Sequence, residues 1–369
     1  MNKIKVMTIF GTRPEAIKMA PLVQELEKRE EIESIVCVTA QHRQMLDQVM
    51  NTFNIKADYD LNIMKPNQTL GEITCNALIG LDNVIKEAKP DIVLVHGDTT
   101  TTFVGSLAAF YNQVAIGHVE AGLRTHNKYS PYPEEMNRQM VDCMTDMFFA
   151  PTNLSAQNLI NEGKEKEKIY VTGNTVIDAM KTTVEKDYKN EVLDWVGEDR
   201  MILLTAHRRE NLGESMYNIF RAVRRIVEEF DDVKVVYPIH LNPKVRSIAN
   251  EVLEDCDKVK LIEPLEVFDF HNFQNKSYII LTDSGGIQEE APSLGKPVIV
   301  LRDTTERPEG IEAGTLKLSG TNEEKIYELT KELLSNNEVY SQMSKANNPY
   351  GDGLASERIV NAIIAKFNK

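Results

Sequence analysis

The chain of 369 residues has ordinary fractions of hydrophobic (42%) and charged (27%) residues and a formal net charge of −14. A chain of this length exceeds what one hydrophobic core usually supports, so we expect two domains. The acidic balance disfavours a general binder of nucleic acids or anionic membranes, because no basic excess is present to displace counterions.

The cysteines and the first residues of the chain indicate in which cellular compartment we expect the protein. The four cysteines lie far apart, without the spacing of a disulfide framework or a zinc site. Met1 leads directly into a short apolar run rather than a secretory signal, and no later segment is long and apolar enough to span a bilayer. We therefore expect a cytoplasmic protein.

Short β-branched runs alternate with helical patterns along the whole chain. Strands that are apolar almost throughout and separated by helices predict parallel sheets covered on both faces. The strands predicted in the first half are 5–9, 35–39, 92–95, 115–119, 147–150 and 169–171. Those predicted in the second half are 201–205, 234–237, 259–262, 279–282, 298–301 and 316–318. The repeated pattern predicts an α/β protein with two parallel sheets.

The predicted domains are residues 1–172 and 173–355. The polar stretch 181–199 separates the two sets of strands only partly. Near the end of the chain, the turn signal at 348–353 precedes a helix predicted over 356–366. We expect this C-terminal helix, within 356–369, to cross back onto the first domain.

Two turns between a strand and a helix have the composition of phosphate sites. Gly11, Thr12 and Arg13 follow the first strand, and Arg13 with Lys18 would suit a pyrophosphate at a helix start. Taken alone, these two cations more often just solvate a helix.

The second such turn follows the strand 279–282. Gly285 and Gly286, after Ser284, let the backbone approach a ligand, and free N–H groups at a helix start attract phosphate. Glu290, one turn further, could accept hydrogen bonds from a ribose.

Carboxylates gather at other predicted strand ends. Asp98 follows the strand 92–95, where its alternative role is to cap a helix. Glu120 ends the strand 115–119, and Glu134 and Glu135 open a helix after Pro133, one serving the helix dipole and the other free to face a ligand. Three carboxylates around one sugar carbon would supply acid–base chemistry if their surroundings separate their pKa values.

The run His207-Arg208-Arg209 needs an anion or a carboxylate to compensate its charge. Glu210 could do so within a purely structural salt cluster. His126, His271 and Cys143 lack such a context, and we expect none of them to be catalytic. Neither a metal triad nor a dinucleotide-binding motif is found, so magnesium and NAD are not predicted.

Ligands of open parallel sheets bind beyond the carboxyl ends of the strands. The unusual residues of both halves follow predicted strand ends. We therefore expect a cleft between the domains, with carboxylates on one rim and phosphate-binding groups on the other.

Motifs along nearly the whole chain carry a family resemblance. They are GTRPEA (11–16), HGD (96–98), EAGLR (120–124), PEEMNR (133–138), HRREN (207–211), SGGIQEE (284–290) and RDTTERPE (302–309). In combination they closely resemble bacterial non-hydrolysing UDP-N-acetylglucosamine 2-epimerases. This resemblance implies two Rossmann-like domains in a glycosyltransferase B arrangement, a homodimer, and a cleft that closes on the substrate.

The resemblance also implies an activity. UDP-GlcNAc and UDP-ManNAc would interconvert by elimination and re-addition of UDP through 2-acetamidoglucal, without a cofactor, to supply ManNAc for a cell-envelope polysaccharide. The implied catalytic residues are Asp98, Glu120, Glu134 and His207. The implied substrate-binding residues are Arg13, Lys18, Phe270 (near uracil), Ser284, Gly285, Gly286, Glu290 (on the ribose) and Arg307.

A second UDP-GlcNAc could act as an activator beside the active site. The segments that match are Gln41, Gln44 and Gln68, with Arg208 and His240 between the two ligands. Three alternatives share the fold: a hydrolysing 2-epimerase that releases UDP and ManNAc, a retaining glycosyltransferase, and a sensor that binds a nucleotide sugar without reaction.

Overall fold

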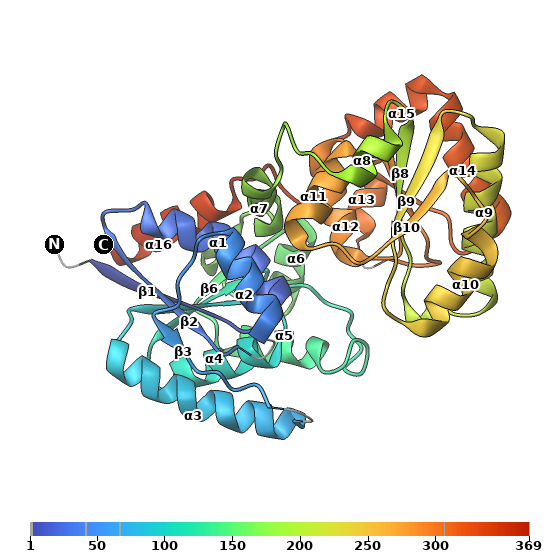
Figure 1. Ribbon diagram of the computed structural model, residues 1–369. Helices are drawn as coiled ribbons and strands as arrows, with labels where there is room; N and C mark the ends of the chain where they lie inside the picture. The colour runs from blue at the N-terminus through green and yellow to red at the C-terminus, as the bar shows by residue number, and fades with distance from the viewer. Residues whose placement is uncertain (1–2, 41–42, 66–67, 306, 369) are drawn as a thin grey trace. The chain divides into compact units, whose positions relative to one another are not determined.

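The computed structural model describes residues 3–40, 43–65, 68–305 and 307–368 (Figure 1). The chain divides into two compact units. Unit 1 consists of Met1–Thr182 and Tyr350–Lys369, and unit 2 is Thr183–Pro349. Each unit is built on its own parallel sheet, so the predicted α/β class with two parallel-sheet domains is confirmed.

The sheet of unit 1 has the strand order β3-β2-β1-β4-β5-β6-β7. Its strands are β1 (Ile4–Phe10), β2 (Ile32–Val38), β3 (Tyr59–Asp60), β4 (Ile92–His96), β5 (Ala115–Val119), β6 (Met147–Ala150) and β7 (Ile169–Val171). Every neighbouring pair is parallel, so all carboxyl ends lie at one edge of the sheet. The central strands are almost completely buried, as their apolar sequences predict.

Helices cover both faces of this sheet (Figure 1). They are α1 (Arg13–Glu27), α2 (Arg43–Thr52), α3 (Leu70–Ala88), α4 (Thr100–Tyr111), α5 (Glu134–Met144), α6 (Asn153–Asn161), α7 (Thr175–Thr183) and α16 (Ala355–Phe367), with the short 3-10 helix η1 (Lys166–Lys168). Apolar residues of α3 and α4 pack with those of β1 and β4 into one core.

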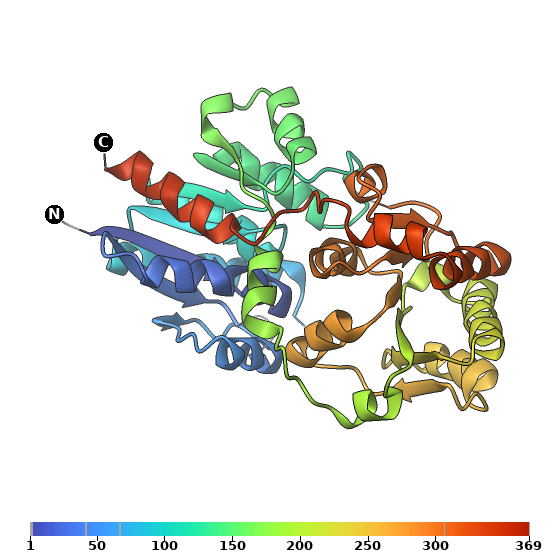
Figure 2. The same cartoon turned by 90° about the horizontal axis from the view of Figure 1, so that it is seen from above.

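The last helix returns to unit 1, where α16 packs against α1 (Figure 2). Asp178 on α7 accepts hydrogen bonds from the amides of Ala355 and Ser356 at 3.2 and 2.8 Å and so caps α16. The amide of Asn174 donates to the carbonyl of Tyr350 at 2.7 Å. The segments that leave and re-enter unit 1 are therefore bonded to each other.

Unit 2 has a sheet of order β10-β9-β8-β11-β12-β13. Its strands are β8 (Arg200–Thr205), β9 (Val233–Pro238), β10 (Val259–Ile262), β11 (Ile279–Thr282), β12 (Val298–Val300) and β13 (Leu316–Leu318). Its helices are α8 (Glu191–Val196), α9 (Glu214–Glu229), α10 (Pro243–Leu253), α11 (Val267–Lys276), α12 (Gly285–Glu290), α13 (Pro308–Glu312), α14 (Glu323–Ser335) and α15 (Asn337–Ser344), with η2 (Arg209–Asn211) and η3 (Ala291–Leu294). All strand pairs are again parallel, with an apolar core on each face.

All the strands predicted from the sequence exist, within three residues at their ends. Sequence analysis missed β3, which has two residues and too little pattern to detect. Within the described ranges, none of the helices combines the length and the hydropathy that a bilayer crossing requires.

Candidate active site

Three predicted carboxylates of unit 1 lie at or after the carboxyl ends of its strands. Asp98 follows β4 by two residues, Glu120 follows β5 directly, and Glu134 opens α5 after the loop that leaves β5. Since the strands are parallel, both strand ends face the same edge of the sheet, where ligands of such folds bind.

Glu120 is the most tightly held of the three. Its Oε2 forms an ion pair with Lys18 Nζ and accepts a hydrogen bond from Asn174 Nδ2 at 3.0 Å. Burial alone would raise the pKa of this carboxyl, but Lys18 and the nearby His96, 3.6 Å away, hold the pKa well below its usual range. Glu120 is therefore ionised at neutral pH, as a proton acceptor must be.

Asp98 is not the helix cap that its position allows. The N-cap of α4 is Thr99, whose hydroxyl accepts from the amide of Thr102 at 3.1 Å. The Asp98 carboxylate instead pairs with Arg138 on α5, while its carbonyl accepts from Asn137 Nδ2 at 2.9 Å. Two residues of one helix turn thus fix the side chain and the backbone of Asp98.

The paired acids at the start of α5 have separate roles. Glu135 is fully buried and accepts from the amides of Thr125 and His126 at 2.9 and 3.0 Å, so it orders the loop before the helix. Glu134 is half-buried, and its Oε2 has no hydrogen-bond partner among the described residues. Of the two, Glu134 is the carboxylate available to a ligand.

In the turn after β1, the carboxylate of Glu15 accepts the hydrogen bonds that a ligand could otherwise accept. Glu15 accepts from the amides of Gly11 and Thr12 at 3.1 and 2.8 Å, and from the hydroxyls of Thr99 and Thr102 at 2.7 and 3.2 Å. Arg13 is half-buried as the first residue of α1, and Lys18 on the same helix faces Glu120.

In unit 2 the turn after β11 leads into α12, with Ser284 at the N-cap. Gly285 lies under Arg307, since a Cβ built on Gly285 would be 3.4 Å from the guanidinium carbon. Arg307 Nε also donates to Glu289 Oε1 at 2.8 Å. Backbone N–H groups and a guanidinium thus converge at the start of α12, a combination suited to phosphate.

Glu290, the last residue of α12, is linked to α11. Its Oε2 accepts from Gln274 Nε2 at 2.7 Å and lies 3.8 Å from His271 Nε2. Phe270, which is also on α11, is partly buried and packs against the core of unit 2. The predicted ribose and uracil contacts thus lie on neighbouring helices.

Asp283, which sequence analysis missed, organises the strand ends of unit 2. This fully buried carboxylate accepts from the amides of His207 and Arg208, both at 2.8 Å, and from Asn211 Nδ2 at 3.1 Å. Burial raises the pKa of Asp283, but the His207 ring 3.3 Å away and the two amides lower it below its ordinary value. Its position between β11 and Ser284 is the signal that could have identified it.

The residues predicted for a second ligand are described in part. The rings of His240 and His207 stack at 5.3 Å, and burial with the neighbouring His207 lowers the pKa of His240. Arg208 Nε donates to the Asp283 carbonyl at 3.0 Å. Gln68 bonds its own loop, accepting from the Lys65 amide at 2.7 Å. Gln41 and the Gln44 side chain lie outside the described part of the chain.

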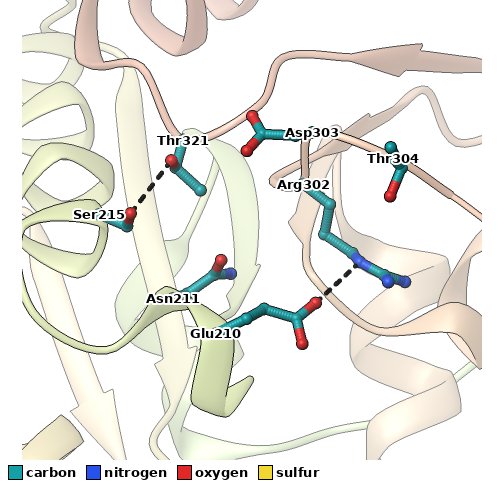
Figure 3. A pocket seen from close by; sticks show the side chains of 7 residues that line it. All are labelled: Glu210, Asn211, Ser215, Arg302, Asp303, Thr304 and Thr321. Atoms are coloured by element: carbon teal, nitrogen blue, oxygen red, sulfur yellow. Dashed lines mark hydrogen bonds and ion pairs between the residues drawn. The ribbon is translucent and has the colours of Figure 1, made fainter. Parts of the chain in front are cut away.

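A polar cavity of about 250 Å³ opens at the carboxyl ends of β8, β12 and β13 (Figure 3). Arg302 points across it to Glu210 at 3.3 Å, and Thr321 donates to Ser215 at 3.2 Å. Glu210 lies 4.0 Å from Arg208. Glu210 thus lies near two arginines, Arg208 and Arg302, while Asp283 accepts the hydrogen bonds of the segment 207–208.

A chain of charges runs from the buried His118, Asp142 and Arg124 to Glu162 at the surface of unit 1. His118 Nδ1 lies 2.6 Å from Asp142, Arg124 bonds the other oxygen of Asp142 at 2.5 Å, and Arg124 also bonds Glu162 at 2.7 Å. Among the described residues, no group of three or more His, Cys, Asp or Glu could hold a metal ion.

Comparison with known proteins places this chain in a family. Residues 24–364 match the family model described as UDP-N-acetylglucosamine 2-epimerase. A UDP-N-acetylglucosamine 2-epimerase of Bacillus subtilis is 69% identical over 100% of this chain and 97% of its own length.

Solved structures agree. A putative UDP-N-acetylglucosamine 2-epimerase from Listeria monocytogenes superimposes with a TM-score of 0.96 at 59% identity, covering 99% of this chain and 97% of the other. The UDP-GlcNAc 2-epimerase from Neisseria meningitidis, bound to UDP-GlcNAc, gives a TM-score of 0.87 at 52% identity over 98% and 100%.

A glycosyltransferase from Rickettsia africae, 14% identical with a TM-score of 0.66 over 100% of both chains, shares the fold. The family model spans both units, and the close relatives cover almost the entire chain. The chain belongs to the UDP-N-acetylglucosamine 2-epimerase family.

Proposed function

We propose that the protein interconverts UDP-GlcNAc and UDP-ManNAc without hydrolysis. The family match and the Neisseria relative with bound UDP-GlcNAc support this substrate. The observation that carries the proposal is a set of three carboxylates held in three different ways. Glu120 pairs with Lys18, Asp98 pairs with Arg138, and Glu134 keeps one buried oxygen without a partner among the described residues.

The chemistry follows from the substrate. No carbonyl acidifies the hydrogen on C2, so this proton leaves only if the electrons of the C–H bond have a destination. As a carboxylate takes the proton, a C1–C2 double bond forms, the C1–O bond breaks, and UDP departs to leave 2-acetamidoglucal. A proton then returns to the opposite face of C2 while UDP re-forms the bond to C1. Asp98, Glu120 and Glu134 are the proposed acids and bases.

Unit 2 would hold the leaving group. Ser284, Gly285 and Gly286 at the start of α12 offer N–H groups to the diphosphate, and Arg307 lies over them. Arg13, Lys18 and His207 would add positive charge as the diphosphate leaves, Glu290 would bind the ribose, and Phe270 would contact uracil. Such pre-positioned donors stabilise charge that develops during the reaction.

A proton NMR time course of UDP-GlcNAc in heavy water tests the proposal. We expect UDP-ManNAc with deuterium at C2 and no accumulation of UDP. Product with full protium at C2 would contradict the elimination mechanism, and UDP released in proportion to free ManNAc would show a hydrolysing enzyme. Turnover only with an added acceptor would indicate a glycosyltransferase, and binding without turnover a sensor.

Replacing His207 tests the departing diphosphate. We expect His207→Ala to lower kcat by about two orders of magnitude, because a hydrogen-bond donor to the developing anion is lost. A variant with unchanged kcat and only lower stability would support a structural role beside Asp283.

Regulation by a second UDP-GlcNAc is part of the proposal. Arg208 and His240 lie next to His207 and could contact both ligands. An activator that binds one conformation more tightly shifts the population toward it. The expected result is a sigmoidal rate with UDP-GlcNAc, and a slow reverse reaction from pure UDP-ManNAc that a trace of UDP-GlcNAc accelerates. Hyperbolic kinetics in both directions would rule this out.

We also expect a homodimer. The neighbouring helices α3 and α4 carry exposed apolar side chains, Ile79 at 65%, Phe110 at 58% and Tyr111 at 62%. Large apolar side chains left exposed on neighbouring helices are candidates for contacts with other proteins. Sedimentation should give twice the chain mass, and Ile79→Glu with Phe110→Glu should give monomers; a wild-type monomer would refute the assignment.

The cellular role completes the proposal. The enzyme would work in the cytoplasm and supply ManNAc for a cell-envelope polysaccharide. Deleting its gene should remove ManNAc from hydrolysed envelope material, and a complementing plasmid should restore it. Unchanged ManNAc after deletion would contradict this role.

A further inference from the structure

A buried histidine that the proposed reaction does not use lies one hydrogen bond from the turn that carries Asp98. His118, near the end of β5, is fully buried. Its Nδ1 is 2.6 Å from Asp142 Oδ1, and its Nε2 is 2.8 Å from the carbonyl oxygen of Gly97. The ring therefore bridges the interior of unit 1 and the turn after β4.

Both partners of the ring are hydrogen-bond acceptors. The Gly97 carbonyl has no proton to donate. The other oxygen of Asp142 accepts from the Arg124 guanidinium at 2.5 Å, and this cation favours the ionised form, so Asp142 is a carboxylate. A neutral imidazole has only one N–H and would direct a lone pair at one of the two oxygens. The contacts therefore require an N–H on each ring nitrogen.

The charges around His118 compensate each other within the network. Asp142 also accepts from Arg124 Nη2 at 2.5 Å, and Arg124 is bonded in turn to Glu162 at 2.7 and 2.8 Å. An imidazolium, a guanidinium and two carboxylates sum to zero. A buried charge that is paired and hydrogen-bonded in this way can persist in the interior.

The turn that His118 holds is the one that sets the position of Asp98. Gly97 has φ +68°, and its amide donates to the Val119 carbonyl at 2.9 Å. The amide and the carbonyl of Gly97 are thus both hydrogen-bonded to residues of β5. A Cβ built on Gly97 would be 3.8 Å from Glu120 Oε1, so this peptide lies beside the second carboxylate as well.

We propose that His118 is a positioning residue: as a buried imidazolium it donates to the Gly97 carbonyl and so orients Asp98 next to Glu120 for the transfer of the C2 proton. This inference rests on the proposed function, in which Asp98 and Glu120 react with the sugar. Small displacements of reacting groups are costly, on the order of a hundredfold in rate per ångström.

Two variants of similar size separate positioning from a merely structural role. His118→Gln places an amide donor near Nε2, toward Gly97, whereas His118→Asn places it near Nδ1, toward Asp142. We expect kcat to fall on the order of tenfold to a hundredfold in His118→Asn, with a clearly smaller loss in His118→Gln. KM should stay unchanged in both variants, since unit 2 holds the nucleotide. Glu162→Gln is the matched control and should keep the wild-type rate, because Glu162 is exposed and solvent can replace its charge.

Folding and protonation are measured separately. UDP titration by calorimetry should show unchanged binding in all variants, which establishes that the nucleotide site is intact. In wild-type protein labelled with ¹⁵N-histidine, both ring nitrogens of His118 should carry a proton. A bare nitrogen on this ring would overturn the proposal, as would equal kcat values for the Asn and Gln variants.

The same experiments distinguish this inference from the proposed function. Wild-type protein that converts no UDP-GlcNAc would refute the proposed function, while the ¹⁵N spectrum would still report the state of His118. Active wild-type protein with a neutral His118 would refute only the inference.

Discussion

The turn after β1 and the turn after β11 look alike in sequence but differ in structure. A Cβ built on Gly11 would be 2.0 Å from Thr39 Oγ1 and 2.6 Å from Thr101 Oγ1, whose hydroxyls bond each other. For Gly285 and Gly286 the nearest atoms would be 3.4 Å away, at the ends of the Arg307 and Glu290 side chains.

The difference shows that one glycine signal has two physical causes. Gly11 makes room for two packed threonines, and the Glu15 carboxylate already accepts from the amides of Gly11 and Thr12. In unit 2 the two glycines face only the ends of the long side chains of Arg307 and Glu290, as a turn that admits a ligand would require. A phosphate contact in unit 1 would thus depend on the Arg13 side chain rather than on these two amides.

The largest effect should come from removing the carboxylate that closes the first turn. Glu15→Ala leaves the buried amides of Gly11 and Thr12 without an acceptor, at about 1–3 kcal/mol each. We expect unit 1 to lose about 2–6 kcal/mol in urea unfolding followed by circular dichroism. Trp195, the single tryptophan, lies in unit 2 and should report an unchanged transition there. Unchanged stability of unit 1 would show that the turn can bond an external anion instead.

Gly11→Ala should have the next largest effect. The added methyl group overlaps two packed hydroxyls, and such overpacking costs about 1–3 kcal/mol. The same circular dichroism measurement should show a less stable unit 1 with normal UDP binding. If Gly11→Ala instead weakened UDP binding at normal stability, the contrast between the two turns would be lost.

Gly286→Ala is the matched substitution in unit 2. Its methyl group meets only Glu290 Oε1 at 3.4 Å, so folding should be unaffected. It would occupy space next to the proposed diphosphate and ribose contacts, and we expect UDP affinity to fall about tenfold, equivalent to about 1.4 kcal/mol. Calorimetric titration of UDP measures this loss, and wild-type affinity would contradict the assignment of the helix start.

The smallest effect we expect is a loss of stability of unit 2 at acid pH. Burial raises the pKa of Asp283, but the His207 ring and two backbone amides outweigh burial and lower this pKa below its ordinary value of 3.8. A depressed carboxyl pKa stabilises the fold above the unfolded-state value, and that stability is lost as the pH falls through the folded-state value, below 3.8. Trp195 fluorescence should show unit 2 weakening in this range, and Asp283→Asn should reduce the dependence. An equal slope in the variant would assign the effect to other carboxylates.

Sequence patterns predicted the sheets because each strand is apolar almost throughout, a local property. They also predicted that Asp98, Glu120 and His207 lie at or just after strand ends. They could not show that Thr99 rather than Asp98 caps α4, or that Asp283 binds the segment 207–208, since these choices depend on contacts between distant residues. The two-residue β3 carried too short a pattern.

The return of α16 to unit 1 has a consequence for the order in which the chain folds during synthesis. Unit 2 is one continuous stretch, whereas unit 1 is interrupted by it. Ile359, Val360 and Ile363 of α16 are buried, so unit 1 lacks part of its apolar packing until this helix has left the ribosome. Unit 2 can therefore complete its core first, and the half of the protein that is translated first is the half that is finished last.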